Sequence, residues 1–174
     1  LGIGHLARIR RIAASLVEAG VQTTLVEGGT PTGLAPAAGV ETIQLPPVRV
    51  AANAMSLLLH ADGSPFMEAD KAARRDQLLA IAARLQPDIL LIEAYPFGRR
   101  AMRFELLPLL AAAGRQADAV IACSVRDILQ ESGDHRRAEE TVETLNRHFD
   151  LVLVHGDEAL TPLSLTFPLA DRIT

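Results

Sequence analysis

Apolar residues follow two patterns along this chain, and the first is helical. Near the start they recur every three or four positions, at Leu6, Ile9, Ile12, Leu16 and Val17. This spacing predicts an amphipathic helix with Gly20 as its C-cap. Similar spacing predicts helices over residues 67–85, 99–113 and 136–148, with an interruption or kink at Pro108. A shorter helix is expected to begin at residues 127–130.

The second pattern is a set of short apolar runs that alternate with these helices. The runs predict strands at residues 21–26, 42–45, 89–92, 119–123 and 151–154. Because strands and helices alternate, we expect an α/β fold with a parallel sheet and helices on both faces. A strand normally feeds a glycine turn such as the one at the start of this chain. We therefore expect one Rossmann-like domain, residues 1–174, whose first strand is missing here.

The pattern is weak only between residues 48 and 65. A short helix around 52–60 is the expectation for this stretch. Its apolar, proline-broken composition leaves two roles open, a surface facing an acceptor or a membrane and a packed loop, and we favour the loop.

Composition narrows the class of protein. With 174 residues, 49% of them hydrophobic, the chain can bury a core. The net charge of −4 argues against nucleic acid as the main partner. Cys123 is the single cysteine and lies in an apolar run, so we expect a buried, inert thiol. No apolar run reaches the roughly 18 residues of a membrane span, and no signal peptide is visible, so we expect a cytoplasmic domain.

Ligands of open α/β sheets bind beyond the carboxyl ends of the strands. Polar and ionisable residues gather at those ends in this sequence. The candidates are Gly2, Gly4, His5, Arg8, Glu27, Glu93, Tyr95, Arg99, Ser124, Arg126, Asp127, His155 and Asp157.

His5 is the candidate catalytic residue. It stands after a glycine turn at the start of a helix, where the helix dipole disfavours a positive charge. A neutral imidazole there suits a general base that deprotonates a hydroxyl. The alternative is a histidine that only caps the helix.

Several other candidates have two interpretations. The arginines that open two helices could bind an anion such as phosphate or extend into water. Glu93 could orient a base or substrate, or pair with Arg99 or Arg100. For Ser124 and Asp127 we favour a helix cap, and for His155 a satisfied histidine at a strand end.

Other classes of site are disfavoured. No metal set is expected, because the five histidines are scattered and no cysteine pair exists. A nicotinamide site is weakly supported, because the glycine turn lacks the third glycine of the fingerprint, although Glu27 lies near the position that would meet a ribose. We expect no cofactor.

Seven motifs together resemble a bacterial family, the predicted glycosyltransferases related to the MurG-type N-acetylglucosaminyltransferase. They are Gly2-Ile3-Gly4-His5-Leu6-Ala7-Arg8, Glu27-Gly28-Gly29-Thr30-Pro31, Gln44-Leu45-Pro46-Pro47, Pro96-Phe97-Gly98-Arg99-Arg100, Arg103-Phe104-Glu105-Leu106-Leu107-Pro108, Ser124-Val125-Arg126-Asp127 and His155-Gly156-Asp157.

The resemblance implies the N-terminal, acceptor-side domain of a GT-B enzyme, without the C-terminal donor-binding domain. It implies inverting transfer from a nucleotide-sugar, a UDP-sugar being favoured, to an unknown acceptor hydroxyl. His5 would be the base, and Arg8 and the glycine turn would stabilise the departing diphosphate. We expect these residues alone to be inactive. The alternatives are a nucleotide-sugar hydrolase of the same fold and a non-catalytic sugar- or nucleotide-binding subunit.

Overall fold

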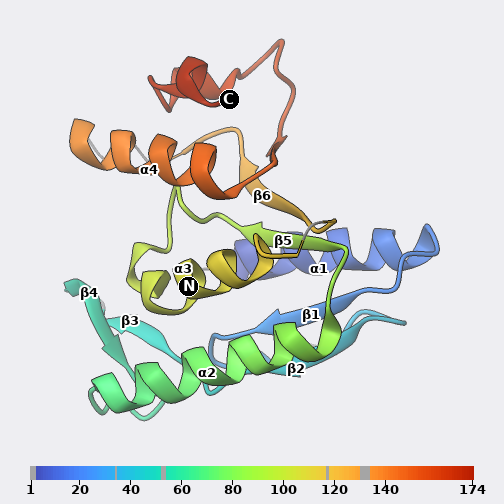
Figure 1. The fold of residues 1–174 in the computed structure, drawn as a ribbon, viewed down its shortest axis with the longest axis vertical. Coiled ribbons are helices and arrows are strands. Elements are labelled where there is room, and N and C mark those ends of the chain that lie inside the picture. Colours follow the sequence, from blue (N-terminus) through green and yellow to red (C-terminus); the bar gives the residue numbers. More distant parts are fainter. Residues whose placement is uncertain (1–2, 34, 52–53, 117, 130–133) are drawn as a thin grey trace. The chain divides into compact units, whose positions relative to one another are not determined.

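The computed structural model describes residues 3–33, 35–51, 54–116, 118–129 and 134–174 (Figure 1). The chain divides into two compact units, Leu1–Leu78 and Leu79–Thr174, with the boundary inside helix α2 (Glu68–Leu85). The single-domain organisation stays a prediction. The chain is mixed α/β with parallel strands, as the alternation predicted.

The first unit begins with helix α1 (Ile3–Glu18). Its C-terminal end is closed by Gly20 at φ 85°, where a side chain would be strained. The Val21 N–H donates to the Leu16 carbonyl at 2.9 Å, and the Gly20 N–H donates to the Val17 carbonyl at 2.9 Å. These two hydrogen bonds form a Schellman motif, which confirms the predicted end of the helix.

Two short parallel strands follow in the first unit. β1 (Thr24–Glu27) pairs with β2 (Glu41–Gln44) from Thr24 opposite Glu41 to Glu27 opposite Gln44. Both strands were predicted, with boundaries that differ by one to three residues.

The stretch after β2 forms a hairpin where a short helix was expected. β3 (Arg49–Ala51) pairs antiparallel with β4 (Ala54–Leu59), and residues 52–53 lie outside the described residues. Leu58 is 3% exposed and its neighbour Leu57 is 48% exposed, the alternation expected of a strand. The helix prediction is therefore wrong for the described part, because pairing with β3 decides the structure of this apolar run.

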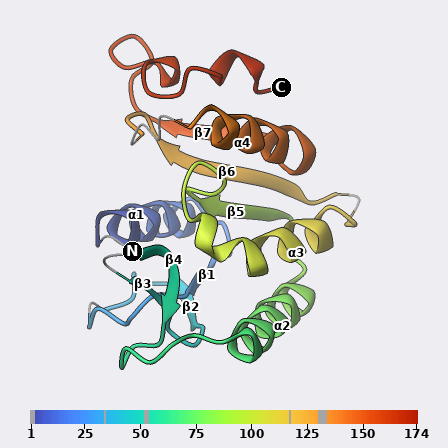
Figure 2. The ribbon, with the colours of Figure 1, turned by 90° about the vertical axis from the view of Figure 1, so that its left-hand side faces the viewer.

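The second unit contains a three-stranded parallel sheet. β5 (Ile89–Glu93), β6 (Val120–Arg126) and β7 (Leu151–His155) lie side by side in chain order. The connections hold a 3-10 turn η1 (Arg100–Met102) with helix α3 (Arg103–Ala113), and helix α4 (His135–His148). In Figures 1 and 2, α3 and α4 lie on the same face of this sheet. The described strands thus form separate sheets, and within this unit the connecting helices cover one face.

The central strand β6 carries the core of the second unit. Ile121, Cys123 and Val125 are at most 3% exposed, and Leu110 of α3 and Leu145 of α4 are equally buried. Burial raises the pKa of the Cys123 thiol to about 12. The expected buried thiol is confirmed.

Three features of the second unit differ from the prediction: the end of β6, the segment after it, and the course of α3 at Pro108. β6 continues to Arg126 because its last residues pair with β7, so residues 127–129 are not helical, and Gln130 lies outside the described residues. α3 is not interrupted at Pro108. The short-helix prediction is therefore wrong for the described residues, and so is an interruption at Pro108, whereas a kink there stays a prediction.

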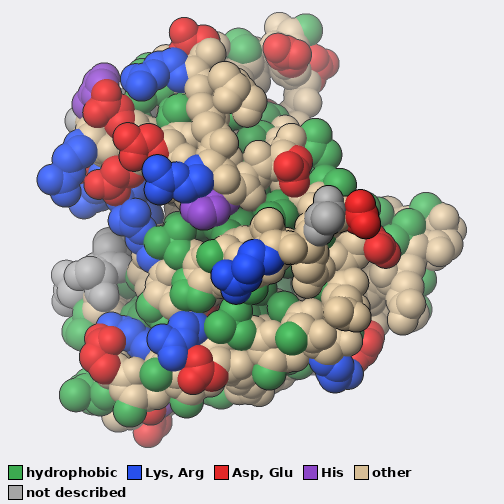
Figure 3. Space-filling model, in the orientation of Figure 1, with side chains coloured by type: hydrophobic (Ala, Val, Ile, Leu, Met, Phe, Trp, Pro, Cys, Tyr) green, Lys and Arg blue, Asp and Glu red, His purple; other side chains and the backbone are tan. Residues whose placement is uncertain are grey.

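α4 is the charged helix that the sequence predicted. The Asp134 side chain caps it by accepting from the Arg137 N–H at 3.3 Å. Figure 3 shows acidic and basic side chains interspersed over this helix. No helix within the described residues has the length and apolar character needed to cross a membrane.

Candidate functional site

The carboxyl ends of β5, β6 and β7 bring four polar residues to one face of the sheet. The register sets Glu93 opposite Ser124, and Arg126 opposite His155. Ser124 and Arg126 are two positions apart on β6, so their side chains leave the same face. This edge is where ligands of open α/β sheets bind, and we name it the β5–β7 edge.

Glu93, Ser124 and His155 are joined by hydrogen bonds. The Ser124 Oγ lies 2.6 Å from Oε2 of Glu93 and 2.9 Å from Nε2 of His155. Ser124 is 0% exposed, and the other two side chains are half-buried. These three residues form what we call the β5–β7 relay.

The direction of the relay follows from its donors and acceptors. A serine hydroxyl has one hydrogen, and an ionised carboxylate can only accept. The short contact therefore commits the Ser124 hydrogen to Glu93, and the Ser124 oxygen accepts the N–H of His155 Nε2. In the neutral imidazole this arrangement leaves the lone pair on Nδ1.

Two of the sequence interpretations change here. Ser124 is not a helix cap, because it lies inside β6 and donates to the side chain of Glu93. His155 lies at the end of β7 and has a hydrogen-bond partner, as expected of a satisfied strand-end histidine. That partner is Ser124, which links the imidazole to Glu93. Arg126 ends β6 as an exposed residue.

The segments that follow β6 and β7 approach closely. A Cβ added at Gly156 would lie 2.5 Å from the Cβ of Asp127 and 2.4 Å from its Oδ2. Only glycine fits beside this side chain. The Asp127 carbonyl also accepts from the Thr166 hydroxyl at 3.0 Å. The His155-Gly156-Asp157 motif therefore contains a packing requirement directly after the relay histidine.

The loop after β5 holds the next two predicted residues. Ala94 and Arg99 have φ values of 65° and 55°, in the left-handed region that non-glycine residues rarely adopt. Tyr95 is 1% exposed, so its side chain belongs to the core. Burial raises the pKa of its phenol, and Arg103 and Arg100 partly oppose the shift. Tyr95 thus belongs to the core of the second unit, and its role as a binding residue stays a prediction.

Arginines at the start of α3 have a carboxylate partner. Arg100 pairs with Glu140 of α4, and Arg103 Nη1 lies 3.4 Å from the same Oε2. The suggested pairing of Arg100 with Glu93 is thus replaced by one with Glu140. These contacts tie the Pro96-Phe97-Gly98-Arg99-Arg100 motif to α4. Phe97 of the same motif packs edge-on against Phe167 of the C-terminal segment, with 5.0 Å between the ring centroids.

In the first unit, polar motif residues bond to one another. Arg10 contacts both carboxylate oxygens of Glu27, at 2.7 Å and 3.0 Å. This pairing occupies the carboxylate that was weighed as a ribose ligand, and it raises the pKa of Arg10.

Arg74 holds the same end of the β1–β2 sheet from α2. It is 3% exposed, and its Nη1 donates to the Gly28 carbonyl at 3.2 Å and to the Pro46 carbonyl. The Gln44 amide donates to the carbonyls of Glu27, Gly29 and Leu45 at 2.8–3.2 Å. Two of the motifs that carry the family resemblance are thus tied together structurally.

The glycine turn is described only from Ile3 onward, so Gly2 lies outside the described residues. Gly4 and His5 lie in the first turn of α1, and no atom lies within 4 Å of a Cβ placed on Gly4. Arg8 Nη2 lies 3.1 Å from Nδ1 of His5. Because a guanidinium can only donate, the Nδ1 lone pair accepts this hydrogen bond.

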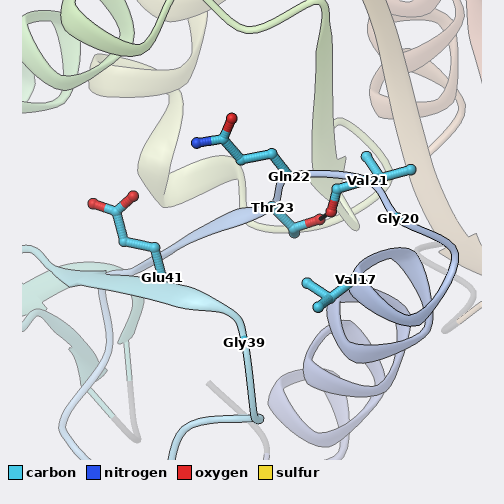
Figure 4. Close-up of a pocket in the computed structure, with 7 residues that line it drawn as sticks. All are labelled: Val17, Gly20, Val21, Gln22, Thr23, Gly39 and Glu41. Carbon is cyan, nitrogen blue, oxygen red and sulfur yellow. Dashed lines mark hydrogen bonds between the residues drawn. The ribbon is translucent and has the colours of Figure 1, made fainter.

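Two shallow hollows occur in the first unit. Figure 4 shows one of about 360 Å³, lined by residues of α1, the α1–β1 turn and the start of β2. It lies at the amino ends of β1 and β2, where ligands of α/β sheets do not usually bind.

The other hollow, of about 470 Å³, follows the carboxyl end of β2 and is lined by Pro46, Pro47, His60, Ala61, Asp62 and Ser64. In it, Asp62 accepts from Ser64, and His60 pairs with Asp70 at 3.2 Å.

The described residues contain no group of three His, Cys, Asp or Glu side chains arranged to hold a metal ion.

Ser124 and His155 are the residues whose hydrogen bonding to each other the sequence interpretation missed. The available signal was the alternation of apolar Cys123 and Val125 with polar Ser124 and Arg126, a strand-like pattern that continues beyond the apolar run. Comparison of this chain with family models, curated proteins and solved structures finds no match.

Proposed function

We propose that this chain is the acceptor-side, Rossmann-like domain of an inverting GT-B glycosyltransferase of the MurG-like type. The single observation that carries the proposal is the β5–β7 relay. It places a carboxylate, a hydroxyl and an imidazole in one hydrogen-bonded set at the carboxyl ends of adjacent parallel strands.

This arrangement suits transfer to a hydroxyl. The acceptor oxygen attacks the anomeric carbon of a nucleotide-sugar, the bond to the diphosphate breaks, and the diphosphate leaves with its electron pair. The attacking hydroxyl must lose its proton, so the site needs a proton acceptor positioned by other groups. Polar groups at the β5–β7 edge also match the hydrogen-bonding demand of a sugar or another polyol.

In this proposal the start of α1 serves the donor. Backbone N–H groups at a helix N-terminus favour an anion, and Arg8 adds a fixed positive charge in the first turns. The departing diphosphate is such an anion. Glu93, Arg99 and Arg126 are the proposed binding residues of the second unit.

The test is a donor screen on the full-length protein. Release of UDP from UDP-glucose and UDP-N-acetylglucosamine is measured with and without glycerol and glucose as acceptor alcohols. We expect UDP release that requires an acceptor and yields a glycoside. Free sugar formed without any acceptor would instead identify a hydrolase, and binding without turnover would identify a non-catalytic subunit.

A further inference from the structure

The two histidines that could serve as the base are hydrogen-bonded in opposite ways. At His5, the Nδ1 atom accepts from Arg8 at 3.1 Å, so a neutral ring carries its hydrogen on Nε2. Its one lone pair is thus engaged by a cation. Taking a proton at Nδ1 would break this hydrogen bond and bring two positive charges together.

At His155 the arrangement is the reverse. Nε2 donates to Ser124, which donates to Glu93, and Nδ1 keeps the lone pair of the neutral ring. A proton taken up at Nδ1 would create a positive imidazolium that is linked through Ser124 to a carboxylate. A base oriented and compensated in this way by a third group is the arrangement that activates nucleophiles in hydrolases and transferases.

We propose that His155, and not His5, is the general base of the reaction, with Nδ1 as the proton-accepting atom. This inference rests on the proposed function. The proton of the acceptor hydroxyl moves to Nδ1 as the acceptor oxygen bonds to the anomeric carbon and the diphosphate departs. Ser124 and Glu93 are positioning residues, which hold the ring and keep Nε2 protonated.

The surroundings of His155 fit this role. Arg126 lies opposite it in the ladder, is exposed, and is available to an anionic group of a bound substrate. Gly156, the next residue in the chain, lies so close to Asp127 that no side chain fits there, which restricts the backbone beside His155. The relay uses residues of the second unit alone, so its geometry is complete within that unit.

The first measurement is the tautomer of His155 by two-bond 15N–1H correlation in full-length protein labelled at histidine. We expect hydrogen on Nε2 and an unprotonated Nδ1 at a pH where the ring is neutral. Ser124→Ala should weaken this preference, whereas His135→Ala, which removes an exposed histidine of α4, should leave it unchanged. Hydrogen on Nδ1 of His155 in the unaltered protein would overturn the proposal.

The second measurement is turnover of the nucleotide-sugar found in the donor screen. His155→Asn should lower kcat about 100-fold or more with KM within a few-fold, the usual range for losing a general base. Ser124→Ala and Glu93→Gln should lower kcat about tenfold, and His5→Ala by less than His155→Asn. A larger loss in His5→Ala than in His155→Asn would overturn the assignment and return the base to α1.

The two measurements separate the inference from the function on which it rests. If no nucleotide-sugar is turned over, the proposed function fails, while the tautomer of His155 still decides whether the relay presents Nδ1 as a proton acceptor. If turnover is found and His155→Asn keeps normal kcat, the function stands and the inference fails.

Discussion

The two parallel sheets of this chain end in different ways. At the carboxyl end of β1 and β2, Glu27 is bound by Arg10, and the loop carbonyls are bound by Arg74. Each strong charge there already has a protein partner. At the carboxyl end of β5–β7, the polar groups form a directed chain that finishes on an imidazole with a lone pair. Both edges are rich in polar motif residues, and among the described residues the second carries the hydrogen-bonded set for which we propose proton transfer.

This difference shows how motifs should be weighed. The motifs around Gly28 and Pro46 are constrained in sequence because the guanidinium of Arg74 must fit between their backbones. The motifs around Ser124 and His155 are distinctive because their side chains meet.

Removing Arg74 should affect stability most. Arg74→Ala leaves the carbonyls of Gly28 and Pro46 without a buried donor, so we expect a loss of about 3 kcal/mol in the free energy of unfolding. Urea denaturation measures the loss, and kcat per folded molecule should not change. The matched control is Arg75→Ala, which removes a half-exposed surface pair with Asp76 and should cost about 0.5 kcal/mol or less. Equal stability of the two variants would remove the distinction between the edges.

A side chain at position 156 should lower the free energy of unfolding by less than Arg74→Ala does, and it should also disturb His155 of the relay. In Gly156→Ala the new Cβ would lie 2.4–2.6 Å from three atoms of Asp127, well inside van der Waals contact, and relieving this overlap should cost about 2 kcal/mol. Gly4→Ala is the control, because no atom lies near its Cβ in α1, and alanine in a helix should be neutral or gain up to about 1 kcal/mol. The His155 ring signals should shift only in the first variant. Unchanged stability and an unchanged His155 spectrum in Gly156→Ala would contradict the close approach.

The smallest effect concerns acid. Arg100, with Arg103 and Arg136, holds the pKa of Glu140 below its ordinary value of 4.5. The folded state therefore binds this proton less readily than the unfolded state. The stabilisation is present above pH 4.5 and is lost as the pH falls through the folded pKa. Melting temperatures of the unaltered protein and of Glu140→Gln should converge as the pH is lowered through this range.

Burial also lowers the pKa of His148 from its ordinary 6.5. Here too the unfolded state takes up the proton first, so stability should begin to fall below pH 6.5. His148→Gln should remove this earlier decline, and His135→Ala should not. A decline that persists in His148→Gln would assign it to another group.

The sequence predicted the parallel strands because each contains a short apolar run, which local composition records, and in β6 this run is also buried. It did not predict where β6 ends, because Ser124 and Arg126 are polar and lie beyond the apolar run. Ser124 pairs with both β5 and β7, and Arg126 pairs with β7. It missed the hairpin for a related reason: Leu57, Leu58 and Leu59 show no alternation in sequence, and their faces differ only once β3 is alongside. The relay depended on the register of three strands, which no local pattern encodes.

Cys123 immediately precedes Ser124 in β6, is 0% exposed, and is the single cysteine of the chain. A thiol whose pKa is raised to about 12 does not react with alkylating reagents while the strand is in place. Labelling of this protein therefore occurs only when β6 opens, and its rate measures how often the central strand separates from its neighbours. Cys123 is thus a built-in probe for the local opening of the sheet that carries the candidate site.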